Sequence, residues 1–172
     1  MPVTVDATVG GAAANSYLTR ARASTLLEAR LDTAPWDTAV EDSQNRALVQ
    51  ATRLIDLRVV WLGTRASETQ ALAWPRSGVV YRDSLLAIPT TIIPLFLELA
   101  TAEYALSLLR TVSTSVQAQS ELKRLVDGSL TLEFRDTLPV VTTEVIPDAV
   151  ALYLEGYGET AAGSNMVWLR RA

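Results

Sequence analysis

The chain has 172 residues, with fifteen basic and nineteen acidic side chains and a formal net charge of −4. Apolar residues make up 49% and charged residues 20%, which is ordinary for one globular domain that can bury a core without metal or disulfide help. The chain contains neither cysteine nor histidine, so disulfides, zinc sites of the Cys/His kind and histidine-based catalytic triads are excluded.

Residues 1–15 are small, rich in Gly and Ala and only weakly patterned, which predicts a strand or a flexible N-terminal arm. A short helix is predicted over 19–31, because apolar side chains recur there at spacings of three and four. The segment 32–42 is predicted to be a loop that Trp36 anchors.

A second helix is predicted over 43–62, where alanine, leucine, isoleucine and valine form a continuous apolar stripe. We expect Asp42 or Ser43 to cap it, because a short side chain with an oxygen can accept a hydrogen bond from a free amide of the first turn. Gly63 fits a C-terminal stop. The long connection 65–89 follows, and connections of this length are often functional or form interfaces.

The most apolar stretch, 92–109, predicts a third helix that is buried on most faces and forms the centre of the core. Its proline and two glutamates argue against a membrane span. Thr90 or Thr91 is the expected cap, and Pro94 is tolerated in a first turn, where its missing amide has no partner to lose. The Ser-, Thr- and Gln-rich residues 111–119 predict a linker.

The clearest strand pattern comes next. Residues 129–135 alternate polar and apolar side chains after an Asp-Gly pair, which predicts a β-hairpin over about 121–136. Residues 138–145 are rich in β-branched side chains and predict a further extended segment. Pro147 and Asp148 open a last helix, which Gly156 and Gly158 should end.

These elements predict a mainly α fold, a small helical domain of three to four helices with a β-hairpin and extended N- and C-terminal arms. The domain is expected to span 16–157, between an arm at 1–15 and a tail at 158–172. Neither a targeting segment nor an internal repeat is visible in the sequence.

Catalytic groups are scarce once histidine and cysteine are gone. Glu98 and Glu103 are five positions apart on a helix, so their side chains point about 140° apart and do not converge. Ser77 lacks the G-x-S-x-G turn of serine hydrolases and a histidine to activate it. Lys123 is the only lysine, and no phosphate-binding motif surrounds it. We therefore expect no enzyme activity, no cofactor and no metal site.

Single-stranded nucleic acid is an alternative ligand. Fourteen arginines accompany four tryptophans and five tyrosines, and arginine with aromatic rings is the chemistry of base stacking. The net negative charge favours the other interpretation, in which the rings anchor a core or an interface and the arginines pair with nearby acids.

The C-terminal tail ends in a short apolar run followed by two arginines, and aromatic and Arg residues are enriched among interface hot spots. The tail either binds a partner, or forms a last strand or a frayed end of its own domain. The residues predicted to bind are Met166, Val167, Trp168, Leu169, Arg170 and Arg171.

One motif makes the chain resemble a known family. Residues 70–79, with Trp-Pro-Arg-Ser-Gly at 74–78, resemble a signature of small tailed-phage and prophage proteins. These are head-to-tail connector (adaptor, or head-completion) proteins, a family that also carries the label DnaT-like single-strand-binding protein. The resemblance covers roughly 16–157. Other segments that agree with the family are 16–19, 51–56, 88–89, 94, 100–105 and 130–134.

The resemblance implies a structural subunit of a ring, usually of twelve copies, that joins the portal to tail, stopper or nozzle proteins. Packaged double-stranded DNA passes through such a ring without sequence-specific binding. The implied place is the head–tail junction of the virion, after assembly in the host cytoplasm and without a membrane.

From this resemblance we expect residues 166–171 to dock on the portal. We expect Trp74, Pro75, Arg76 and Tyr81 to brace their loop or to contact a neighbouring subunit. Two alternatives stay open, a single-stranded-DNA-binding replication protein and an interaction domain for another partner. A basic face lined by aromatic rings would favour the replication protein.

Overall fold

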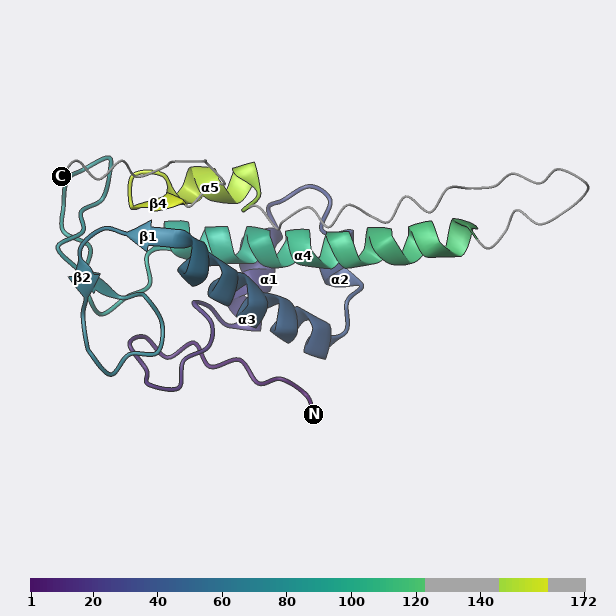
Figure 1. Cartoon of the computed structure of the whole chain (residues 1–172), viewed down its shortest axis with the longest axis horizontal. Coiled ribbons are helices and arrows are strands. Elements are labelled where there is room, and N and C mark those ends of the chain that lie inside the picture. The colour runs from purple at the N-terminus through teal and green to yellow at the C-terminus, as the bar shows by residue number, and fades with distance from the viewer. Residues whose placement is uncertain (123–145, 161–172) are drawn as a thin grey trace, which may run out of the picture.

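The computed structural model describes residues 1–122 and 146–160 (Figure 1). The predicted class, a mainly helical domain with a small β component, is confirmed, and the described residues hold five helices, one of them a single turn. In chain order the elements are α1 (Arg20–Leu27), α2 (Ala34–Asp37), α3 (Glu41–Arg58), β1 (Val59–Trp61), β2 (Thr64–Arg65), β3 (Arg76–Ser77), α4 (Leu95–Leu122), α5 (Asp148–Leu154) and β4 (Gly158–Thr160).

Helix α4 is the centre of the fold. It lies between α5 on one side and α1, α2 and α3 on the other (Figure 1). Leu97 and Leu106 of α4 are buried, and so are Leu48 and Ile55 of α3. Because burying one such side chain contributes roughly 1.5–3 kcal/mol, this helix contact is a main source of stability. None of the described helices is both long and apolar enough to cross a membrane.

Two small antiparallel sheets lie at the end of the molecule where α4 begins (Figure 1). β1 pairs with β4, so that Val59 is opposite Thr160 and Trp61 is opposite Gly158. β2 pairs with β3, and Thr64 is opposite Ser77. The first pair connects distant parts of the chain, whereas both strands of the second pair lie within the connection between α3 and α4.

Helix α1 begins where predicted, and the Thr19 hydroxyl accepts a hydrogen bond from the amide of Arg22 (3.2 Å). It ends at Leu27 rather than near residue 31. The helical bonding pattern is lost there, because the Arg30 amide donates to the Leu27 carbonyl only three residues earlier (2.9 Å).

The predicted loop after α1 contains the single turn α2. Pro35 stands at the start of this turn, a position that suits its fixed φ. Trp36 is buried, as predicted, and its indole nitrogen donates to the Ser24 hydroxyl (3.1 Å). The tryptophan therefore joins the single turn to α1.

The start of α3 corrects one prediction. The helix begins at Glu41, so the predicted cap at Asp42 or Ser43 is wrong. The Asp42 carboxylate instead accepts hydrogen bonds from the amide of Val3 (2.7 Å) and from Arg46 (2.7 Å). Its negative charge in the first turn also interacts favourably with the helix dipole.

The end of α3 also differs from the prediction. The helix stops at Arg58 rather than at residue 62, because the β-branched and aromatic residues 59–61 form β1. Gly63 is not the helix stop. It lies in the turn between β1 and β2, with a φ of 68°.

Helix α4 starts directly after Pro94, whose carbonyl accepts hydrogen bonds from the amides of Leu97 (3.0 Å) and Glu98 (3.2 Å), so the predicted cap at Thr90 or Thr91 is wrong. The predicted linker at 111–119 is also wrong, because α4 continues through it. Serine and threonine cost a helix only roughly half a kcal/mol each. The Thr111 hydroxyl donates to the carbonyl four residues earlier (3.0 Å), and an established helix propagates through such residues.

Helix α5 follows Pro147 and ends before Gly156, as predicted. The hairpin predicted near 121–136 lies outside the described residues, except that 121 and 122 end α4. The extended segment predicted over 138–145 and the tail residues 161–172 also lie outside them.

Candidate functional site

The motif at 74–78 begins with a buried tryptophan. Trp74 is 1% exposed, and its peptide bond to Pro75 is cis. The Trp74 ring meets the rings of Trp61 and Phe96 edge to face, in each case with the centroids 5.6 Å apart. Such pairs contribute roughly 0.5–1.5 kcal/mol beyond burial. Trp74 thus joins the loop to β1 and to α4.

Arg76 braces the same loop through backbone carbonyls. Its guanidinium donates to the carbonyl oxygens of Leu62 (2.7 Å), Gly63 (2.7 Å) and Ala73 (3.2 Å). Partial burial lowers the pKa of Arg76 from its ordinary value. These contacts tie Arg76 to the β1–β2 turn and to its own loop, and its predicted roles as a loop brace or a subunit contact stay predictions.

The rest of the loop is held by its own polar groups. Pro75 is buried, and its carbonyl accepts from the Ala66 amide (3.1 Å) and the Gln70 side chain (3.1 Å). Arg65 donates to the carbonyl oxygens of two further loop residues, one of them Leu72 (2.9 Å). A loop with this many internal bonds presents a defined surface.

Asp56 is a residue that the sequence did not single out. Periodicity places it outside the apolar stripe of α3, yet its carboxylate accepts hydrogen bonds from the Tyr17 hydroxyl and from the Ala73 amide (2.9 Å). Burial raises the pKa of Asp56. Burial and the neighbouring carboxylate raise the pKa of Tyr17 well above its ordinary value of 10.0. One carboxylate therefore holds together the segment before α1, α3 and the loop.

A hollow lined by aromatic rings opens on the surface near Trp74. Its volume is about 440 Å³. Phe96 and Tyr157 stack face to face in it, with centroids 3.7 Å apart and planes 4° apart. Its lining residues are Tyr81, Arg82, Asp83, Leu95, Phe96, Leu99, Tyr153 and Tyr157.

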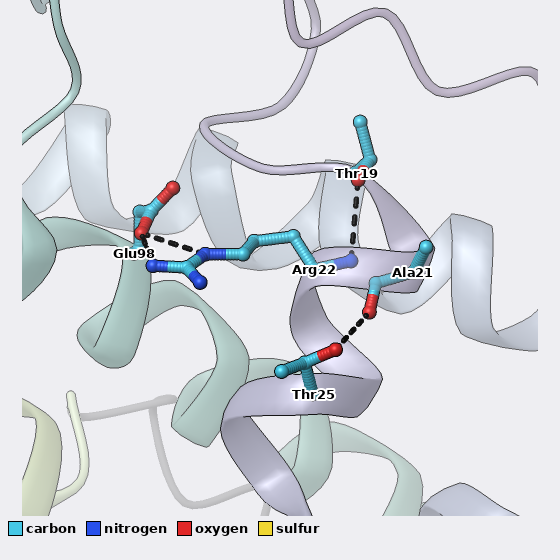
Figure 2. A network of polar contacts seen from close by, with 5 residues as sticks. All are labelled: Thr19, Ala21, Arg22, Thr25 and Glu98. Carbon is cyan, nitrogen blue, oxygen red and sulfur yellow. Dashed lines mark hydrogen bonds and ion pairs between the residues drawn. The ribbon is translucent and has the colours of Figure 1, made fainter.

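A second hollow, of about 550 Å³, adjoins the first and shares Tyr81 and Leu95 with it. Its walls include α1 and the start of α4, where Arg22 donates to Glu98 through two nitrogens (3.1 and 2.9 Å; Figure 2). This ion pair ties the two walls together. We call the two hollows together the aromatic groove.

The described arginines are largely paired. Six form ion pairs with acids, namely Arg20, Arg22, Arg30, Arg46, Arg82 and Arg110. Within the groove Arg82 lies beside Asp83, and its guanidinium is 3.7 Å from the Glu155 carboxylate. The groove is therefore aromatic without being basic. Within residues 1–122 and 146–160, no three acidic side chains are placed together to hold a metal ion.

The structure separates the predicted site residues. Trp74, Pro75 and Arg76 lie inside the braced loop, whereas Tyr81 lines the aromatic groove. The predicted portal-binding residues 166–171 lie outside the described residues. The groove as a whole was not predicted, because its rings come from the long loop, from α4, from α5 and from Tyr157 after α5, and they meet only in the fold.

A family model described as "Putative DnaT-like ssDNA binding protein" matches residues 1–172. The chain belongs to this family. The match confirms the DnaT-like label that accompanied the resemblance at 74–78, and it does not bear on a connector role. Comparisons with curated proteins and with solved structures found no match.

Proposed function

We propose that this DnaT-like family member is a subunit of the ring that joins a tailed-phage portal to the tail components around the DNA channel. The observation that carries the proposal is the amount of apolar surface near the aromatic groove. Leu85 is 76% exposed, Leu86 67% and Leu152 67%, while Leu95 and Tyr153 in the groove are 52% and 36% exposed. Exposed apolar surface of this kind marks sites of protein association.

The braced loop gives such a surface the rigidity that a ring needs. A ring closes when two different patches of one subunit meet those of its neighbours in a fixed relative orientation. Arg76 and Asp56 hold the loop to α3 and to the β1–β2 turn, so the loop keeps one geometry. We propose that the ring forms on the portal, at the head–tail junction of a virion assembled in the host cytoplasm.

The acidic balance of the chain suits a subunit beside passing DNA. Sequence-independent DNA binding comes from basic groups that contact phosphates. Because the chain carries nineteen acids against fifteen basic residues, and the described arginines are largely paired, the proposed channel does not retain DNA.

The proposal includes docking of the C-terminal residues 166–171 on the portal. We expect the Trp168→Ala variant, and the chain truncated after Gly163, to lose co-purification with the cognate portal. The Leu31→Ser variant changes a leucine that is 91% exposed and does not line the groove, so it is the matched control and should bind normally.

Electron microscopy of the co-purified complex without imposed symmetry tests the ring itself. A ring of copies beneath the portal is the expected result. Absence of any association with the portal would contradict the adaptor function. Normal binding of the Trp168→Ala chain would contradict only the role of the tail.

A second candidate function, a single-stranded-DNA-binding replication protein, is favoured by the description of the family. Base stacking uses aromatic rings, and the groove supplies them at Tyr81 and Tyr153. Arg82 lines the same hollow. Asp83 and Glu155 next to that arginine oppose the approach of a phosphate backbone. We therefore keep this function as the alternative.

A further inference from the structure

The aromatic groove leaves apolar side chains in contact with water. Ile92, Leu95 and Tyr153, which line it, are 40%, 52% and 36% exposed. The two hollows adjoin at Tyr81 and Leu95, and their volumes of about 440 and 550 Å³ leave room for several side chains of a peptide segment rather than for one small side chain. Covering such side chains contributes roughly 25 cal/mol for each Å² removed from water.

The last described strand follows directly after a residue of this groove. Tyr157 belongs to the groove, and β4 ends only three residues later, at Thr160. Trp168 is eight residues beyond Thr160. At roughly 3.3 Å per residue those eight residues span up to about 26 Å, which is enough to return to the groove. Residues 163–165 read Gly-Ser-Asn, the residue types that favour such a reversal.

The chemistry of these residues also matches the groove. Residues 166–169 are Met-Val-Trp-Leu, which offer one aromatic ring and three aliphatic side chains to a lining of tyrosine, phenylalanine and leucine. Arg170 and Arg171 then carry two positive charges. The first hollow contains Asp83, and Glu155 lies at 3.7 Å from Arg82 at its edge, so acids are present to meet them.

We infer that the segment 164–172 docks in the aromatic groove of its own molecule, with Trp168 and Leu169 against Leu95, Phe96 and Tyr153. The arginines then face Asp83 and Glu155. Because only a short tether separates the tail from Tyr157 in the groove, the effective concentration is high and modest contacts suffice. The inference concerns the free chain and stands whether or not the proposed adaptor function is correct.

If the adaptor function is also correct, the two roles of the tail exclude each other. Residues 166–171 cannot contact the portal and the groove at the same time. The groove then acts as an autoinhibitory contact that keeps the tail covered until the portal competes for it. Portal binding of the chain would expose the groove for a neighbouring copy.

Fluorine NMR of the full chain labelled with 5-fluorotryptophan tests the docking. We expect one fluorine signal for each of the four tryptophans. The signal that is missing from the Trp168→Phe chain belongs to Trp168. We expect the Trp168 signal to shift little between H2O and D2O, because a docked indole is shielded from solvent. In the Leu95→Ser and Tyr153→Ser chains we expect the full solvent shift of an exposed indole.

The Leu31→Ser chain is the control, since this side chain is exposed and lies outside both hollows. Circular dichroism shows whether each variant is folded. A fully solvent-exposed Trp168 in the unmodified chain overturns the inference. Shielding that grows with protein concentration also overturns it, because the tail then docks on a second copy. A tail that is shielded in a chain without portal affinity supports docking while contradicting the adaptor function.

Discussion

The Asp56 carboxylate shows how much depends on one residue of this fold. It accepts hydrogen bonds from the Tyr17 hydroxyl and from the Ala73 amide, and so connects segments that lie far apart in the sequence. Tyr17 is 2% exposed. Replacing it by phenylalanine leaves the buried carboxylate without its hydroxyl donor. We expect Tyr17→Phe to lower the free energy of unfolding by about 1–3 kcal/mol near neutral pH.

The same substitution should change the response to high pH. The pKa of Tyr17 in the folded chain lies well above 10.0, so above pH 10 the unfolded chain loses this proton while the folded chain keeps it. The folded state then binds more protons, and the free energy of unfolding falls as the pH rises. In Tyr17→Phe this part of the fall is absent.

Urea unfolding at several pH values from neutral to above 10 measures both effects. Tyr153→Phe is the control, because this tyrosine lies partly exposed at the surface and its hydroxyl donates no described hydrogen bond. If stability falls with pH equally steeply in the Tyr17→Phe chain and in the unmodified chain, the raised pKa of Tyr17 does not cause the loss of stability at high pH.

Residue-scale chemistry of this kind could not be predicted from the sequence. Asp56 lies outside the apolar stripe of its helix, and a periodic pattern treats such a residue as solvated. Whether a polar position faces water or a loop depends on where residues 65–89 return, which local spacing does not encode. Trp36 was predicted correctly because a large ring among polar residues has few places except the core.

At the scale of elements, the turn between β1 and β2 depends on a glycine. Gly63 has a φ of 68°, and a Cβ there would lie 2.3 Å from the Ser77 carbonyl oxygen and 2.7 Å from a Val79 methyl. Alanine at this position would have to adopt a left-handed backbone conformation, which costs roughly 1–2 kcal/mol. Its Cβ would also clash with the backbone of Ser77. We expect Gly63→Ala to lower the melting temperature strongly.

Gly78 offers a matched comparison in the same loop. Its φ is 78°, but an added Cβ would meet nothing closer than 4.0 Å. Gly78→Ala should therefore cost only the free energy of placing alanine in a left-handed backbone conformation. In thermal unfolding, we expect the melting temperature of Gly63→Ala to be clearly below that of Gly78→Ala. Equal melting temperatures would mean that the close approach of the β1–β2 turn to β3 does not limit stability.

The helices were predicted correctly where a sequence pattern within the helix itself, or at its ends, indicates them. Apolar spacing located α1, α3 and α4, because burial in a shared core imposes a helical period on each, whereas Pro147 and the glycines after it located α5. The ends were less predictable, since 59–61 continue the apolar stripe of α3 and turn into a strand only because β4, distant in the sequence, pairs with them. The run 111–119 lacks large apolar residues, yet it continues a helix that packing elsewhere has already nucleated.

At the scale of the whole molecule, the distribution of charge yields a prediction that separates the two candidate functions. A protein that neutralises Z phosphates of a single strand binds with a logarithmic salt slope of about −0.7Z, so real single-strand binding weakens steeply with salt. Here ion pairs occupy six of the described arginines, and Arg65 and Arg76 bond to carbonyls.

We therefore expect only weak binding of oligo(dT) to the full chain, with a dissociation constant no tighter than roughly 10⁻⁴ M at physiological salt, the weak limit of non-specific association. Fluorescence anisotropy of a labelled oligonucleotide, repeated over a range of salt concentrations, measures this. Tight binding with a steep salt slope, lost in Tyr153→Ala but kept in Leu31→Ser, would show that bases stack in the aromatic groove. That result would favour the replication function, because an adaptor channel needs no such affinity for a free strand.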